Sequence, residues 1–136
     1  MKEPLAFEVA LPCSCPEAID RVTTALRAEG FGILTRIDVK ETMKQKLGVD
    51  FRPYVILGAC NPPLAHRALS AQPLAGLLLP CNVTVEEREK GGATVRIGNP
   101  EVLLAAGGLQ EHAALREAGL EARDRLRRVA EALRAA

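Results

Sequence analysis

The chain has 136 residues, 48% of them hydrophobic, and a formal net charge of +1 at pH 7. This length and apolar content predict a single domain with a sizeable core. A charge so close to zero argues against nucleic acid or an anionic membrane as a partner. No apolar run approaches the roughly 20 residues needed to cross a bilayer, and the first residues are unlike a signal peptide. We therefore expect a soluble, cytoplasmic protein.

The source and redox state are less constrained. Arginine outnumbers lysine, and Asn and Gln are scarce, as is typical of a GC-rich or heat-adapted source. Cytoplasmic cysteines are usually reduced, but intracellular disulfides occur in hyperthermophiles. The composition therefore leaves the oxidation state of the four cysteines open.

Two strand–helix pairs are predicted in the first 48 residues. Apolar side chains alternate at residues 5–11 and 31–37, which indicates strands. Ser14 and Asp38 each stand three residues before a glutamate, which is the spacing of a helix start. Gly30 and Gly48 are suited to end these two helices.

The stretch 54–63 predicts a buried strand followed directly by a helix. Residues 54–59 are apolar on both parities, so we expect a central strand covered on both faces. Asn61 and Pro62 are suited to begin the following helix, and Pro73 to close it.

An antiparallel hairpin is predicted next, with strands at residues 76–86 and 93–98 joined through Gly91 and Gly92. Pro80 cannot donate a ladder hydrogen bond, so we expect a bulge or an edge position there. The acidic pair Glu86 and Glu87 stands beside the turn and is expected to be solvated.

The end of the chain is predicted to be helical. Asn99 and Pro100 begin a short helix through residue 106, Gly107 and Gly108 form a hinge, and residues 109–136 form one long helix. We expect one domain over residues 1–108, with the last helix packed on it or on a second subunit. Acidic side chains interrupt the arginines of this helix, which argues against nucleic-acid binding. Its apolar seam has heptad-like spacing and consists of Leu115, Gly119, Ala122, Leu126, Val129 and Leu133.

The order of these elements predicts an α+β fold. A hairpin and a long terminal helix do not suit a purely parallel, doubly wound sheet. We expect a two-layer sandwich with a curved, largely antiparallel sheet, and a mixed α/β sheet is the alternative.

Two Cys-Asn pairs are the leading site candidates, Cys60-Asn61 and Cys81-Asn82. If both cysteines face the same layer, they could form a disulfide or redox pair, or bind a soft metal. The alternative is that each is a small buried apolar side chain. Asn61 is explained as a helix cap, and Asn82 by the disruption at Pro80.

Other chemistry finds little support in the chain. Ser14 and Ser70 are not in a nucleophile elbow, and no phosphate-binding glycine motif is present. Cys13 and Cys15 are too closely spaced for a typical zinc pair. We predict no catalytic residue, no metal ligand and no cofactor.

Several short motifs, taken together in this order, resemble the domain of unknown function 302 family, and within it proteins of thermophilic bacteria. The resemblance covers about residues 5–102 and leaves the last helix outside. It implies a compact α+β fold with a curved sheet like that of the TATA-binding protein, and a homodimer. It implies neither DNA binding nor any catalytic residue. The motifs are Gly30-Phe31, Ile37-Asp38-Val39, residues 57–62, Leu79-Pro80-Cys81 and Asn99-Pro100.

The sequence therefore predicts a small homodimer without catalytic machinery that binds a small ligand or a partner in the concave face of its sheet. Cys60, Asn61, Cys81 and Asn82 are expected to line or support this site. The alternative function is that of a thiol-based redox or soft-metal-binding protein that uses Cys60 and Cys81.

Overall fold

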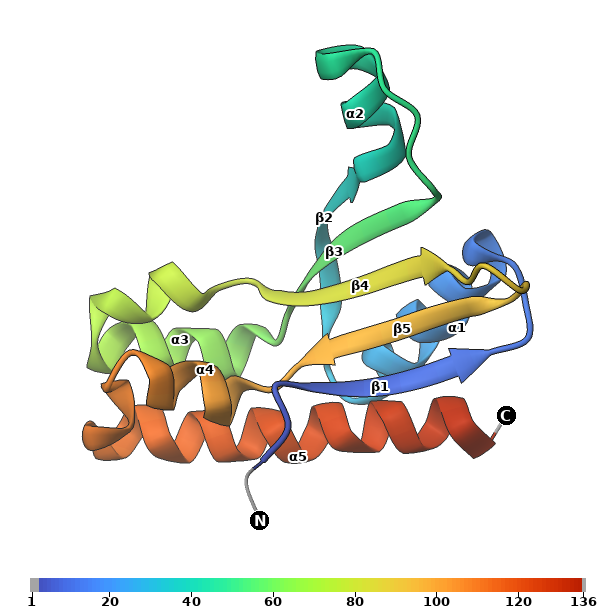
Figure 1. The fold of residues 1–136 in the computed structure, drawn as a ribbon. Coiled ribbons are helices and arrows are strands. Elements are labelled where there is room, and N and C mark those ends of the chain that lie inside the picture. The colour runs from blue at the N-terminus through green and yellow to red at the C-terminus, as the bar shows by residue number, and fades with distance from the viewer. Residues whose placement is uncertain (1–2, 136) are drawn as a thin grey trace.

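A five-stranded antiparallel sheet forms one layer of the computed structural model, which describes residues 3–135 (Figure 1). The strands lie in the order β1-β5-β4-β3-β2, and each is antiparallel to its neighbours. This confirms the predicted α+β sandwich. The strands are β1 (Ala6–Leu11), β2 (Gly32–Asp38), β3 (Tyr54–Cys60), β4 (Cys81–Glu87) and β5 (Ala93–Gly98).

Helices form the second layer and one end of the molecule. In Figure 1, α3 and α4 lie beyond one end of the sheet, while α5 runs along the whole molecule. Within residues 3–135, no helix is long and apolar enough to cross a membrane. The helices are α1 (Cys15–Ala28), α2 (Val39–Leu47), α3 (Pro62–Ala71), α4 (Pro100–Ala106) and α5 (Ala113–Ala135), and the 3-10 turns are η1 (Pro73–Leu78) and η2 (Leu109–Glu111).

The core lies between the sheet and two helices, α1 and α5. Alternate residues of a strand point to the same face, and the strand register aligns these residues into apolar rows. The helices cover these rows with side chains of α1, such as Val22 and Leu26, and of α5, such as Leu126 and Val129. One row is Val9, Val95, Val85 and Val55, and the next is Phe7, Ile97, Val83 and Leu57.

The seam of α5 is buried against its own chain, including Leu115 and Leu133. The long helix begins later than expected, because η2 follows the glycine hinge and His112 has extended backbone angles. A continuous helix is possible only after His112, so the predicted start at residue 109 is wrong.

The predicted helix starts are confirmed by their hydrogen bonds. Each cap residue accepts a hydrogen bond from a backbone N–H in the first turn, which satisfies a group that has no partner within the helix. The cap residues are Ser14, Asp38, Asn61 and Asn99.

Two predictions for the middle of the chain are wrong. Strand β3 lies inside the sheet, but helices cover only one of its faces, so Tyr54 and Ile56 are half-buried on the other. Residues 76–80 are not part of a strand. Pro73 opens η1, whose first turn is capped by Gln72, and β4 begins only after Pro80, which has no N–H for the sheet. The peptide bond between Leu79 and Pro80 is cis.

The α2 helix projects from the body of the molecule (Figure 1). None of its residues is buried. We call residues 32–49, which comprise β2, α2 and the two following residues, the α2 arm. Its large exposed apolar side chains are Leu34, Ile37, Leu47 and Val49.

Candidate functional site

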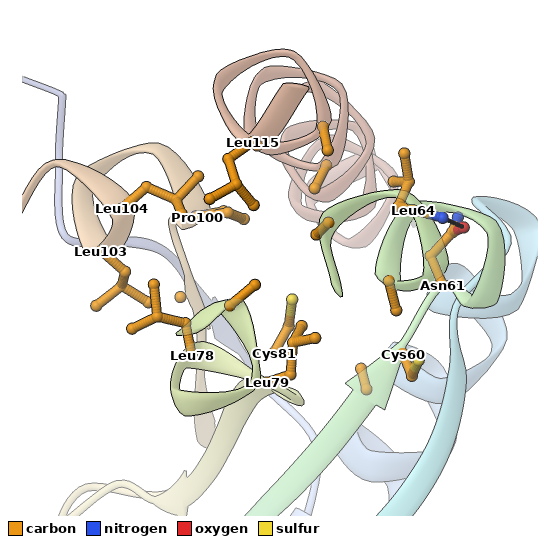
Figure 2. Close-up of a pocket in the computed structure, with 18 of the residues that line it drawn as sticks. Cys60, Asn61, Leu64, Leu78, Leu79, Cys81, Pro100, Leu103, Leu104 and Leu115 are labelled. Atoms are coloured by element: carbon orange, nitrogen blue, oxygen red, sulfur yellow. Dashed lines mark hydrogen bonds between the residues drawn. The ribbon is translucent and has the colours of Figure 1, made fainter. Parts of the chain in front are cut away.

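A cavity of about 80 Å³ lies where the sheet ends and α3, η1, α4 and α5 come together (Figure 2). It adjoins the last residues of β3 and β5 and the first residues of β4. Almost all of its lining is apolar. The lining residues are Phe31, Ala59, Cys60, Asn61, Leu64, Ala65, Ala68, Ala75, Leu78, Leu79, Cys81, Asn82, Gly98, Pro100, Leu103, Leu104, Leu115, Ala118, Gly119 and Ala122.

Two similar turns create this space. Asn61-Pro62 ends β3 and begins α3, while Asn99-Pro100 follows β5 and begins α4. Both helices pack on α5, and its first half lines the cavity. The cavity therefore lies at the end of the sheet, whereas a binding site was expected in the concave face of the sheet.

Small side chains keep the space open. Six alanines, Ala118 among them, line the walls. Gly119 lies directly against Leu104, and a Cβ atom at this position would overlap the Cδ1 atom of Leu104. The packing of Leu104 against α5 therefore requires a glycine, and a larger residue would push this side chain aside.

The thiol of Cys81 points into the cavity (Figure 2). Burial raises the pKa of this thiol to about 11, with a smaller contribution from Cys60. Cys81 is therefore a neutral thiol at pH 7, whereas the thiolate is the form that attacks electrophiles and binds metals.

Cys60 lines the same cavity from a different direction. The register pairs Ala59 with Cys81, so Cys60 is one residue beyond this pair and its side chain has the opposite parity. The two cysteines therefore do not face one layer, although both border the cavity. All four cysteines are free thiols. Among residues 3–135, no three His, Cys, Asp or Glu side chains are grouped so that they could hold a metal ion.

Asn61 is buried and both ends of its amide are engaged. Its Oδ1 accepts a hydrogen bond from Leu64 N at 3.2 Å, and its Nδ2 donates to Glu29 O at 3.4 Å. A Cβ atom at Gly30 would lie 2.8 Å from this Nδ2. Asn61 therefore joins the end of α1 to the start of α3, beside the cavity.

Replacing Asn61 by alanine is expected to lower the free energy of unfolding by about 1–3 kcal/mol, since both a helix cap and a buried hydrogen bond are lost. Asn61→Ser retains a capping oxygen and loses the donor to Glu29 without introducing a charge, so it should cost less. Urea denaturation of the three proteins measures the difference. Equal losses in both variants would contradict the double role of Asn61.

Asn82 lies on the other side of the sheet. Its side chain is exposed and shares parity with Thr84 and Glu86, on the face without helices. Its backbone lies at the cavity beside Gly98. Of the four residues named from the sequence, Cys60, Asn61 and Cys81 thus come together at the cavity, with Asn82 contributing main chain.

A charged network on the sheet face without helices was not predicted from the sequence. Glu86 is buried, with 8% of its surface exposed, so the expectation of a solvated carboxylate is wrong. It accepts hydrogen bonds from Arg96 and from Arg52, the latter at 2.5 Å, and Arg96 also contacts Glu8. The Arg96 hydrogen bond is the main reason that the pKa of Glu86 is lowered. The alternation of side chains along each strand could be read from the sequence. The register that pairs the strands and joins these residues could not.

Comparison with known proteins places nearly all of the chain in one family. The sequence model described as "Domain of unknown function DUF302" matches residues 7–133. The crystal structure of an uncharacterized conserved DUF302 protein from Bacillus stearothermophilus shares 31% identity, with a TM-score of 0.83, and the match covers 96% of this chain and 98% of that one. No protein with a curated description matches. The match extends through most of α5, so the expectation that this helix lies outside the family resemblance is wrong.

Proposed function

The chain belongs to the DUF302 family, and from this premise we propose that it is a homodimeric binding domain that holds a small apolar ligand in the cavity beside Cys81. The observation that supports this proposal is the cavity itself. Protein interiors are close-packed and leave few voids larger than a water molecule. A cavity of about 80 Å³ with apolar walls is therefore an unusual feature, and ligand sites are typically of this apolar, concave kind.

Filling the cavity tests this proposal. Small apolar probes, benzene and 1-butanol, are titrated into the protein while the methyl signals of Leu103 and Leu115 are followed by NMR. We expect at least one of the two probes to shift these signals in a saturable way in the wild-type protein, and neither to do so in Ala68→Leu, whose larger side chain occupies the cavity. Ala71→Leu is the matched control, because it makes the same change on the exposed side of α3. If no probe shifts the cavity signals, the proposed function is wrong.

The α2 arm supports the homodimer. Its large apolar side chains are 45% to 68% exposed, and such exposed apolar surface is typical of an interaction site. The helix has Glu41 near its start and Lys46 near its end. Two copies related by a two-fold axis can place these opposite charges against each other along antiparallel α2 helices. This makes a second copy of the chain the occupant that best suits the arm.

Replacing Leu47 by glutamate is expected to weaken the dimer at least tenfold, since it places an extra charge in the apolar contact. Sedimentation equilibrium measures the dissociation constant. Leu77→Glu is the control, because Leu77 is 82% exposed and lies outside the arm. A monomeric wild-type protein, or equal weakening by both variants, would contradict this assignment.

The alternative function, thiol-based redox or soft-metal chemistry, predicts a reactive Cys81. The raised pKa of the Cys81 thiol instead supports an unreactive cysteine. We expect Cys81 to react slowly with a thiol reagent at pH 7 and to become reactive as the pH approaches 11 or when denaturant is added. Since the folded state holds this proton more tightly, stability should also fall as the pH rises from about 9 to about 11. Cys81→Ala is the control for both measurements. Fast labelling of native Cys81 at pH 7 would favour the alternative.

A further inference from the structure

We infer that the cavity takes the end of an unbranched aliphatic chain, which enters between Leu78 and Leu103 and leaves its polar head in water. This inference rests on the proposed function and specifies the chemical class of the ligand.

The lining requires an apolar occupant. Among residues 3–135, none that lines the cavity has a charged side chain. Both amide atoms of Asn61 are already hydrogen-bonded, and Cys81 is a neutral thiol. A polar group placed inside would lose its hydrogen bonds to water without finding new ones, which makes its burial unfavourable. The part of the ligand that enters must therefore be hydrocarbon.

The size of the cavity favours a chain over a ring. A cavity of about 150 Å³ is known to hold benzene, and this one is about half as large, at about 80 Å³. By proportion it has room for roughly three to four carbons in a row. Phe31 is the one aromatic side chain among the lining residues, so the walls provide little stacking for a planar ring.

Leu78 and Leu103 mark the entrance. They come from η1 and α4 and point toward one another across the gap between these elements (Figure 2). Both are half-buried, whereas Leu104 and Leu115, deeper in the wall, are buried. A chain that passes between the two half-buried leucines reaches the cavity without displacing a strand of the sheet. Its polar head then stays outside, where it is solvated.

The test is a homologous series of 1-alkanols from propanol to octanol, with binding followed through the methyl signals of Leu103 and Leu115. Each methylene buried in an apolar site contributes enough to tighten binding about fourfold. We expect this increment until the cavity is full, at about four carbons, and a smaller one beyond. The matching alkanoates should show the same increments, because the head remains in water. Cyclohexanol should bind at least tenfold more weakly than 1-hexanol, since a ring cannot pass the leucine pair and fill the narrow space.

Two variants test whether the size of the cavity sets the alkanol length at which the increment falls. The leucine side chain of Ala68→Leu has three more carbons than alanine, so space for only about one carbon should remain, and the steep rise from propanol to butanol should disappear. Ala71→Leu should leave it unchanged. Equal binding of cyclohexanol and 1-hexanol, or the same break in the series for Ala68→Leu and the wild-type protein, would overturn the inference while leaving an apolar binding cavity in place. The proposed function itself fails only if neither the alkanols nor benzene shift the cavity signals.

Discussion

Leu126→Ala is expected to lower the free energy of unfolding by about 2–5 kcal/mol. Leu126 is fully buried, with 0% of its surface exposed, in the core formed by α1, α5 and the sheet. Truncating the Leu126 side chain removes buried apolar surface and leaves a cavity that the close-packed neighbours cannot fill. Chemical denaturation followed by circular dichroism gives the change directly.

Leu5→Ala is the matched control, because Leu5 is 65% exposed and the same atoms are removed. It should change stability by less than about 0.5 kcal/mol. A loss below 1 kcal/mol for Leu126→Ala would show that α5 contributes little to the stability of the folded monomer. Its seam would then be free to serve a second subunit, as the sequence pattern also allowed.

Gly58→Ala is expected to lower the free energy of unfolding by about 1–3 kcal/mol. A Cβ atom at Gly58 would overlap the Oγ1 atom of Thr35 and would lie 2.7 Å from the Cγ atom of Pro80. The proline ring cannot rotate away, so the strands β2 and β4 would have to move. Thermal and urea denaturation measure the loss.

Gly32→Ala tests whether the effect is specific to this crowding. Gly32 lies in the neighbouring strand β2, and a Cβ atom there would meet no other atom within 4 Å. We expect little change or a slight gain in stability, since alanine restricts the unfolded chain more than glycine does. Equal losses at both positions would mean that a general loss of strand flexibility, and not contact with Pro80, explains the need for Gly58.

Most of the fold could be predicted because its signals are local. A helix cap such as Asn61 acts on an N–H three residues away, and the turn through Gly91 joins strands that are close in the sequence. The errors occurred where the pattern did not distinguish alternatives. The leucines of η1 are compatible with a strand or a turn, and only Pro73 at its start and Pro80 shortly after its end argued against a strand.

The candidate site could be predicted only in part. Cys60-Asn61 was correctly located at a strand end, whereas Cys81-Asn82 was expected inside a strand that in fact begins at Cys81. Whether Cys60 and Cys81 share a face depends on the register of β3 with β4. A shift of one residue moves every side chain to the opposite face. Likewise, Glu86 is covered by Arg96 from the paired strand β5 and by Arg52, which is 34 residues away in the sequence, and only the strand register brings both to it.

The sequence by itself therefore determined the elements of this protein, their capped ends and the antiparallel hairpin, because each depends on residues a few positions apart. Only the tertiary structure decided that α5 covers its own sheet, that Asn61 ties α1 to α3, and that a cavity remains beside Cys81. These features arise from contacts between segments remote in sequence. A cavity in particular is space that many side chains leave unfilled, so no single motif of the chain encodes it.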